Sequence, residues 1–138
     1  MVITIDSMAT EPLYQQIGTQ IIAAIAQGEL VAGDALPSVR SLAGDLGINL
    51  HTVAKAYAVL RDEGYLVMHR RSGAVVADRT ASQALRRGDE QDEAMREELR
   101  RLAMAYKARG GTRSGFVCEC ETVMAAVFGE GSPQAQGE

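Results

Sequence analysis

One short stretch combines side chains that can hydrogen-bond to the bases and phosphates of a nucleic acid. It opens at Asn49, a favourable residue for the N-cap of a helix, and continues through Leu50, His51, Thr52 and Lys55. The major groove of DNA accepts one α-helix whose N-terminal residues face the base edges. We therefore expect His51, Thr52 and Lys55 to contribute to base readout or to nearby phosphate contacts. Leu50 is placed to contact a thymine methyl group.

Further cations and a helix start flank this stretch on both sides. Ser38 and Arg40 open the preceding predicted helix, and free N–H groups at a helix start suit a phosphate. Arg70 and Arg71 lie in a polar loop, and the following Gly73 allows a close approach of the backbone. Roles without DNA contact stay open, because Arg40 could form a surface ion pair and the two loop arginines could simply be solvated.

Apolar spacing supplies the helices that would position these groups. A first helix is expected to start at Thr10-Glu11-Pro12 and to end at Gly28. A second starts after Ser38 and ends at Gly47, and a third runs from Asn49 to the Asp62-Glu63-Gly64 segment. Two short helices joined by a glycine-containing turn predict a helix-turn-helix, with Tyr57 on the core side.

The periodicity changes after the third helix. Residues 65–68 and 74–77 are predicted strands, and the basic loop 69–73 joins them. A hairpin directly after a helix-turn-helix is the wing of a winged helix. Near the N-terminus, residues 3–5 are either a short strand or a tail.

The second half of the chain predicts a helical tail. Its apolar residues step by four, three and four, a narrow seam like that of a coiled coil, at Met95, Leu99, Leu102 and Tyr106. Gly88-Asp89-Glu90 is expected to kink or interrupt this helix, and Gly110-Gly111 to end it. A last amphipathic helix is expected over 116–128. We expect the seam and the last helix to form a dimer surface.

Three regions follow from these patterns. Residues 10–78 form a winged helix-turn-helix, residues 79–128 a helical dimerisation tail, and residues 129–138 a disordered C-terminus. The fold class is therefore mainly α with a small β-hairpin. Aliphatic side chains must build the core, because aromatics are only 4% of the 138 residues and tryptophan is absent.

Composition bounds the function further. No run approaches the roughly 20 apolar residues of a membrane span, and no signal peptide is recognisable, so we expect a cytoplasmic protein. The net charge of -4 is acidic for a DNA-binding protein, but binding depends on where the cations lie. That acidity keeps a second hypothesis open, a winged helix used for protein–protein contact.

Catalysis and metal binding have little support in the residues. No glycine-rich phosphate loop and no nucleophile turn is present, so we expect no enzyme. Cys118 and Cys120 form a lone Cys-x-Cys, which is a weak signal for zinc. We expect neither a cofactor nor a metal. A ligand- or metal-gated regulator remains a third hypothesis, and any small-molecule effector is unknown.

Several linked motifs resemble the GntR family of bacterial regulators over roughly residues 10–78. They are Pro12-Leu13-Tyr14-Gln15-Gln16-Ile17, Gly33-Asp34-Ala35-Leu36-Pro37-Ser38-Val39-Arg40-Ser41-Leu42-Ala43, Asn49-Leu50-His51-Thr52-Val53-Ala54-Lys55-Ala56-Tyr57, and Leu60 with Glu63-Gly64-Tyr65-Leu66. The short two-helix tail resembles the YtrA-type subfamily. This resemblance implies a homodimeric repressor on a two-fold symmetric DNA operator, with transporter genes as the usual targets. It also implies that Arg40 contacts DNA. The loop around Arg70 and Arg71 departs from the common wing pattern of the family.

Overall fold

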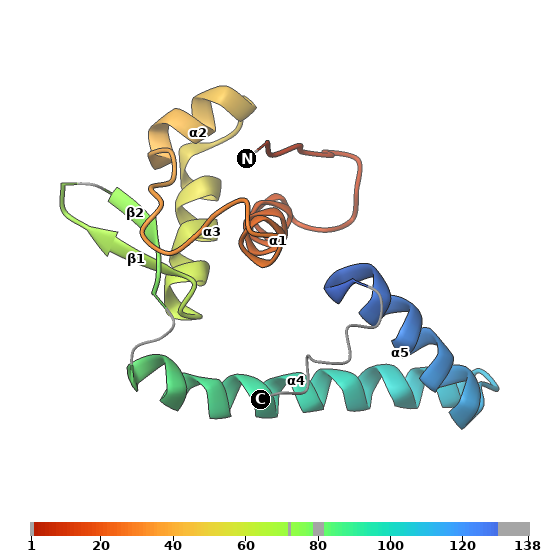
Figure 1. The fold of residues 1–138 in the computed structure, drawn as a ribbon. Coiled ribbons are helices and arrows are strands. Elements are labelled where there is room, and N and C mark those ends of the chain that lie inside the picture. The colour runs from red at the N-terminus through yellow and green to blue at the C-terminus, as the bar shows by residue number, and fades with distance from the viewer. Residues whose placement is uncertain (1, 72, 79–81, 130–138) are drawn as a thin grey trace. The chain divides into compact units, whose positions relative to one another are not determined.

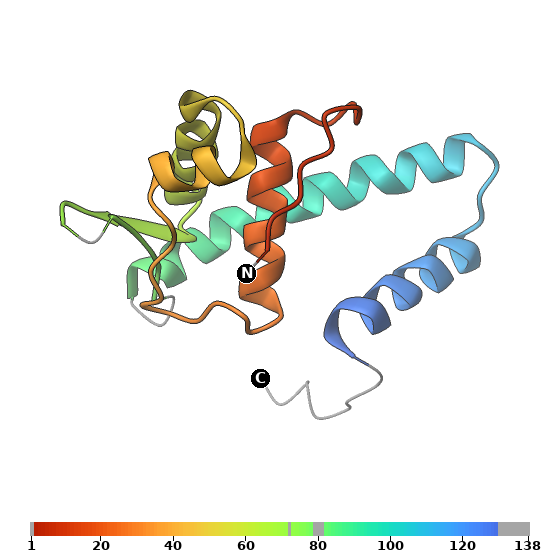
Figure 2. The same ribbon diagram turned by 90° about the horizontal axis from the view of Figure 1, so that it is seen from above.

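The computed structural model describes residues 2–71, 73–78 and 82–129, with side chains described outside residues 82–89. The elements in order are α1 (Leu13–Ala26), α2 (Val39–Leu46), α3 (Leu50–Asp62), β1 (Leu66–His69), β2 (Gly73–Val76), α4 (Ser82–Ala108) and α5 (Arg113–Phe128), as Figures 1 and 2 show. Two compact units divide the chain, Met1–Gly88 and Asp89–Glu138. This architecture confirms the predicted fold class.

The N-terminal segment is a strap rather than a strand. The backbone of Thr4 exchanges hydrogen bonds with the side-chain amide of Gln20, at 2.9 and 2.7 Å. The buried Gln16 amide does the same with Asp6, at 2.9 and 3.0 Å. Ile3 and Ile5 pack against the core from this segment. The first helix begins at Leu13, with Pro12 as its N-cap, slightly later than the predicted start.

The helix-turn-helix has the caps that the sequence predicts. Ser38 Oγ accepts a hydrogen bond from the backbone N–H of Ser41 at 3.0 Å, which caps α2. Gly47 ends α2 with φ of 68°, a left-handed conformation that glycine adopts without a steric penalty. Asn49 Oδ1 then accepts from the N–H of His51 at 2.7 Å and caps α3. Because each cap joins residues two or three positions apart, nearby sequence alone determines where α2 and α3 begin.

The hairpin is present, but each strand is displaced by one residue from its predicted position. Leu66 pairs with Val76 and His69 pairs with Gly73 in an antiparallel register. The buried residues are Leu66, Ala74 and Val76, so the alternation toward the core sets the register. Gly73 opens β2 with φ of 72°, a left-handed conformation that glycine adopts without a steric penalty.

A third backbone segment, which the sequence analysis did not anticipate, pairs with β2. Val76 exchanges backbone hydrogen bonds with residues 33 and 34, and Leu36 N–H donates to the carbonyl of Ala74, all at 2.9 Å. An isolated antiparallel bridge joins Ala35 to Val75. These bonds attach the wing to the segment that leads into α2.

The core lies entirely in the first unit. It is aliphatic apart from one aromatic ring, with fully buried side chains at Ile17, Ile21, Val53, Tyr57, Leu60 and Leu66. Tyr57 donates its hydroxyl hydrogen to the carbonyl of Pro37 at 2.8 Å. Burial raises the pKa of Tyr57 to about 12, because the phenolate would be poorly solvated there. Tyr57 is thus a core residue, as its position on the apolar stripe indicated.

The second unit holds most of α4, together with α5. The prediction that Gly88 interrupts the first tail helix is wrong, since α4 runs without a break from Ser82 to Ala108. An internal glycine costs a helix only about 1 kcal/mol, which neighbouring helix formers offset. Gly110, with φ of 96°, follows the end of α4, and Thr112 caps α5 by accepting from Gly115 N–H at 3.1 Å.

The tail as described has no core of its own. No described side chain between residues 90 and 129 is buried. The predicted disorder of the C-terminus concerns residues that lie, from 130 onward, outside the described part of the chain. None of the helices that the structure describes is both long and apolar enough for a membrane crossing.

Candidate nucleic-acid interface

The outward side of α3 carries the predicted contact residues. Leu50, His51 and Lys55 are exposed and Thr52 is half-buried, while Val53, Ala56 and Tyr57 are buried against the core. The side of α3 that faces away from the protein is therefore polar and uncovered within the first unit. Asn49, the remaining predicted residue of this helix, is exposed and uses its side-chain oxygen as the cap.

The first turn of α2 carries an exposed cation, Arg40. Ser38 and Arg40 are both exposed, and Ser38 caps the helix. The backbone N–H groups of a first turn have no partner inside the helix, so they are available to an anion. Tyr57 fixes this start relative to α3 through its hydrogen bond to Pro37.

The wing tip presents two exposed arginines. Arg70 and Arg71 lie in the turn between β1 and β2, and Gly73 follows that turn. A Cβ atom added at Gly73 would meet no atom within 4 Å. Gly73 is thus required by its positive φ rather than by a close neighbour in the chain.

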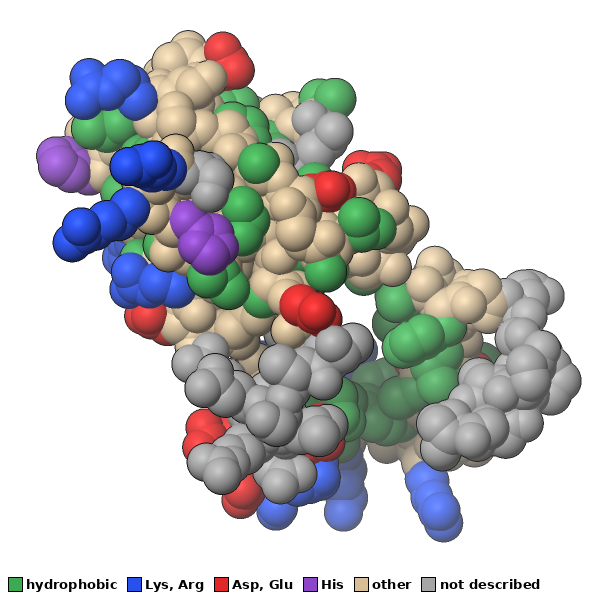
Figure 3. All heavy atoms as spheres, turned by 60° about the vertical axis from the view of Figure 1, so that its left-hand side comes forward, with side chains coloured by type: hydrophobic (Ala, Val, Ile, Leu, Met, Phe, Trp, Pro, Cys, Tyr) green, Lys and Arg blue, Asp and Glu red, His purple; other side chains and the backbone are tan. Residues whose placement is uncertain are grey.

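Lysine and arginine side chains gather on one face of the first unit, over α2, α3 and the hairpin, as Figure 3 shows. The two histidines of the chain lie among them, and acidic side chains stand at the margins of this face. One ion pair in the first unit joins Arg61 to Asp62 at 3.1 Å. The acidic net charge of the chain therefore coexists with a locally basic face.

A shallow hollow of about 430 Å³ opens where the first turn of α1 meets α3. We call it the α1–α3 hollow, and its lining residues are Leu13, Tyr14, Asn49, His51, Thr52 and Lys55. The ammonium of Lys55 lies 4.1 Å from the centroid of the Tyr14 ring. The sequence analysis did not single out Tyr14. Its aromatic ring at the start of a helix was a visible signal, but its contact with Lys55 depends on the packing of two helices.

The four seam residues of the tail differ in their exposure to solvent. Met95, Leu99 and Leu102 are exposed large hydrophobic side chains on α4. Tyr106 is half-buried instead, with its ring centroid 5.7 Å from that of Phe116 on α5. Arg109 also lies over the Tyr106 ring at 5.1 Å.

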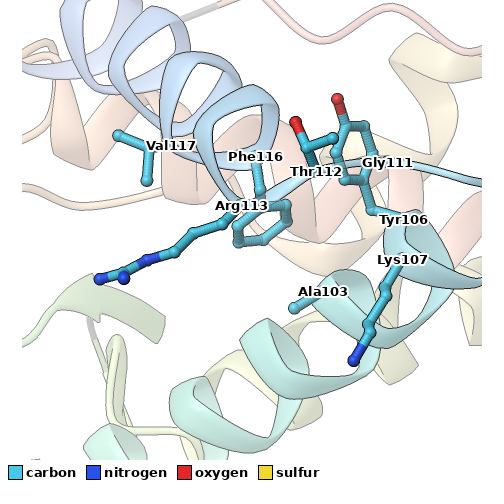
Figure 4. Close-up of a pocket in the computed structure, with 8 residues that line it drawn as sticks. All are labelled: Ala103, Tyr106, Lys107, Gly111, Thr112, Arg113, Phe116 and Val117. Carbon is cyan, nitrogen blue, oxygen red and sulfur yellow. The ribbon is translucent and has the colours of Figure 1, made fainter.

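Tyr106 lies directly against the two glycines that flank the start of α5. A methyl group added at Gly111 would collide with the Tyr106 ring, and one added at Gly115 would come within 2.5 Å of its hydroxyl oxygen. Figure 4 shows the ring beside Gly111 and Thr112 in an apolar pocket of about 400 Å³. Tyr106 therefore packs within the turn between α4 and α5, which the seam prediction did not foresee.

The cysteines show no sign of a metal centre. Cys118 is exposed and Cys120 is half-buried, and both are free thiols. Within the described part of the chain, His, Cys, Asp and Glu side chains form no group of three that could hold a metal ion.

A helix-turn-helix with an attached basic hairpin defines the winged-helix class of DNA-binding regulators. The profile of the bacterial regulatory proteins of the gntR family matches residues 13–76. An HTH-type transcriptional regulator of Mycobacterium tuberculosis is 34% identical over 110 residues, which cover 80% of this chain and 84% of the relative. The chain belongs to the gntR family.

Two further relatives place it within that family. The HTH-type transcriptional repressor YtrA of Bacillus subtilis is 38% identical over 76 residues, 55% of this chain and 58% of that protein. The solved structure of YtrA from Sulfolobus acidocaldarius, a GntR-family transcription factor, is 37% identical and superposes with a TM-score of 0.57. That similarity covers 91% of this chain and 99% of the other. The YtrA-type assignment is thereby confirmed, and the protein is a DNA-binding transcription regulator rather than an enzyme.

Proposed function

We propose that this protein is a homodimeric repressor that binds a two-fold symmetric operator in double-stranded DNA. The observation that supports it most directly is the basic face formed by α2, α3 and the wing tip. In this proposal the exposed side of α3 enters the major groove, with His51, Thr52 and Lys55 toward the bases or the adjacent phosphates. Ser38, Arg40 and the N-cap residue Asn49 are placed for the DNA backbone.

The wing is assigned to the DNA flanking the major-groove contact. Arg70 and Arg71 are exposed at its tip, and the pairing of β2 with residues 33–36 fixes it against the segment before α2. This backbone pairing fixes the base of the wing, so that the loop carrying both arginines projects from a defined position. Gly73 keeps the turn compact enough for the backbone to approach DNA.

The tail is assigned to dimerisation. α4 presents Met95, Leu99 and Leu102, and α5 presents Val117, Val123, Met124, Val127 and Phe128, all exposed. At about 100° per residue, these large apolar side chains fall on one broad side of α5, as expected of a helix that packs that side against a partner. A second copy of this chain supplies the cover, and it also doubles the number of phosphate contacts. Tyr106 supports this surface indirectly, by packing the turn between the helices.

The repressor assignment and the target genes follow from relatives only. The Bacillus subtilis protein that matches is named a repressor. We propose an operon near the protein's own gene, such as a transporter operon, as the target.

Selection of bound fragments from a random DNA pool, followed by sequencing, tests the proposal. The expected result is a motif with two inverted half-sites. On that motif, Arg40→Ala and Lys55→Ala should each weaken binding and reduce the slope of log affinity against log salt by about one per half-site. Arg61→Ala is the matched control, because Arg61 lies in the last turn of α3 and pairs with Asp62.

Enrichment of no motif would contradict sequence-specific binding. Equal affinity of the Arg40→Ala, Lys55→Ala and Arg61→Ala variants would contradict the assigned face. Binding to a protein surface with no measurable DNA affinity would favour the alternative of a protein–protein module.

A further inference from the structure

Lys55, the exposed cation in the first two turns of α3, contacts an aromatic ring rather than an acid. Lys55 comes from the second turn of α3 and Tyr14 from the first turn of α1, and the ammonium stands 4.1 Å from the ring centroid. That distance is within the roughly 6 Å over which a cation is attracted to the face of an aromatic ring. Tyr14 is half-buried, so its ring is held by packing while Lys55 remains exposed.

The type of partner matters for what Lys55 can still bind. A carboxylate would neutralise the ammonium and compete with a phosphate for it. A ring face attracts the cation through its quadrupole and carries no net charge. None of the ion pairs found among the described residues involves Lys55. The Lys55 ammonium is thus not shared with a carboxylate in these ion pairs, and its N–H donors can turn toward a ligand.

The ring also restricts a long and flexible side chain. A free lysine samples many rotamers and loses that freedom when it binds a phosphate. The contact with the Tyr14 ring confines the Lys55 side chain before DNA binds, and this reduces the entropy that is lost on binding. The α1–α3 hollow places the restricted ammonium beside His51 and Thr52, on the outward side of the recognition helix.

We propose that Tyr14 is a positioning residue of the DNA interface, which presents Lys55 to a backbone phosphate seated at the α1–α3 hollow. This inference rests on the proposed DNA-binding face and adds to it a residue of α1. It assigns Lys55 to the backbone and not to a base edge, because α1 borders the hollow and lies outside the helix-turn-helix that enters the groove. The role of Tyr14 is indirect, since its ring acts through Lys55.

The test is a double-mutant cycle on the selected operator, with Tyr14→Leu, Lys55→Ala and the combined variant. Tyr14→Leu keeps apolar volume but removes the ring, so we expect affinity to fall about two- to five-fold per half-site. The salt slope should stay at the wild-type value, because the charge of Lys55 is retained. In the Lys55→Ala background, Tyr14→Leu should have no further effect.

Tyr14→Phe is the matched control, since it keeps the ring face and removes only the hydroxyl. It should bind like the wild type. Thermal unfolding of each variant separates a change in binding from a change in fold. Lys55→Ala should lower affinity by the same factor for the operator and for unrelated DNA, as expected of a phosphate contact.

Three outcomes would overturn the inference. Tyr14→Leu could bind as tightly as the wild type, it could weaken binding equally with and without Lys55, or Lys55→Ala could relax the base preference at one position. Each of these leaves the DNA-binding proposal intact if Arg40→Ala still weakens binding. Failure of the DNA-binding proposal would give a different result, in which the wild-type protein selects no motif from the random DNA pool.

Discussion

The two units of this chain use their apolar residues in opposite ways. In the first unit, three helices and a hairpin bury their aliphatic faces against one another, around Ile17, Ile21 and Leu60. In the second unit, α4 and α5 expose large hydrophobic side chains, with Phe128 82% accessible. A monomeric protein rarely leaves a broad apolar surface open to water. The first unit therefore contains its own core, whereas the described part of the second exposes the apolar side chains that we propose are covered in the dimer.

The largest effect is expected from acidic residues placed in the seam of α4, because they should abolish dimerisation. The double variant Leu99→Glu with Leu102→Glu puts two charges on the exposed apolar side of α4, and burying them in a dimer would be costly. We expect monomers in sedimentation and an operator affinity lower by about a hundred- to ten-thousand-fold, because avidity is lost.

The control for the seam is Arg101→Glu, which changes the net charge equally on the same helix. Arg101 pairs with Glu98 at 2.5 Å on the exposed surface, and such pairs contribute little to stability. This variant should remain dimeric. A dimer that survives both glutamates would place the interface elsewhere.

A cavity in the core should affect the other unit alone. Leu60 is 1% exposed, so Leu60→Ala should lower the free energy of unfolding of the first unit by about 2–5 kcal/mol. Urea denaturation should give the same midpoint shift at all protein concentrations. The unfolding of the tail should instead depend on concentration, as expected when stability comes from association. A concentration-independent tail transition would contradict the distinction between the units.

Alkaline pH should destabilise the first unit through Tyr57. Its pKa is raised from 10.0 to about 12 by burial, so the neutral hydroxyl stabilises the fold fully below pH 10. That contribution is lost as pH rises from 10 through about 12, and it amounts to about 2–3 kcal/mol. Tyr57→Phe should be less stable by about 1 kcal/mol at neutral pH, because the Pro37 carbonyl loses its donor. The difference between wild type and Tyr57→Phe should then vanish or reverse above pH 12.

The smallest effects are expected from glycine-to-alanine substitutions, which should stabilise the first unit and destabilise the second. At Gly18 in α1, an added methyl group meets only the Leu60 side chain at 3.9 Å, an ordinary contact. Gly18→Ala should therefore stabilise the first unit by about 0.5–1 kcal/mol. At Gly111 the methyl group would collide with the Tyr106 ring, so Gly111→Ala should displace that ring. The cost is about 1–3 kcal/mol, measured as weaker dimerisation.

Much of the first unit could be predicted because its signals are local. Ser38, Gly47 and Asn49 define the helix ends through bonds that span two to four residues along the chain. The hairpin was predicted with an error of one residue, because several polar and glycine positions near its tip offered no unique register. Register was decided by Leu66, Ala74 and Val76, which must face a core formed by distant helices.

The order of local elements, their caps and their amphipathic faces follow from the amino-acid sequence alone. Those features depend on residues a few positions apart, and the same residues carry the resemblance to the GntR family. Three contacts depended on the tertiary structure: the pairing of residues 33–36 with β2, Tyr14 beneath Lys55, and Tyr106 against Gly111. Each joins groups whose separation is set by how helices or strands pack, and a periodic pattern in one element carries no information about the neighbour that it meets.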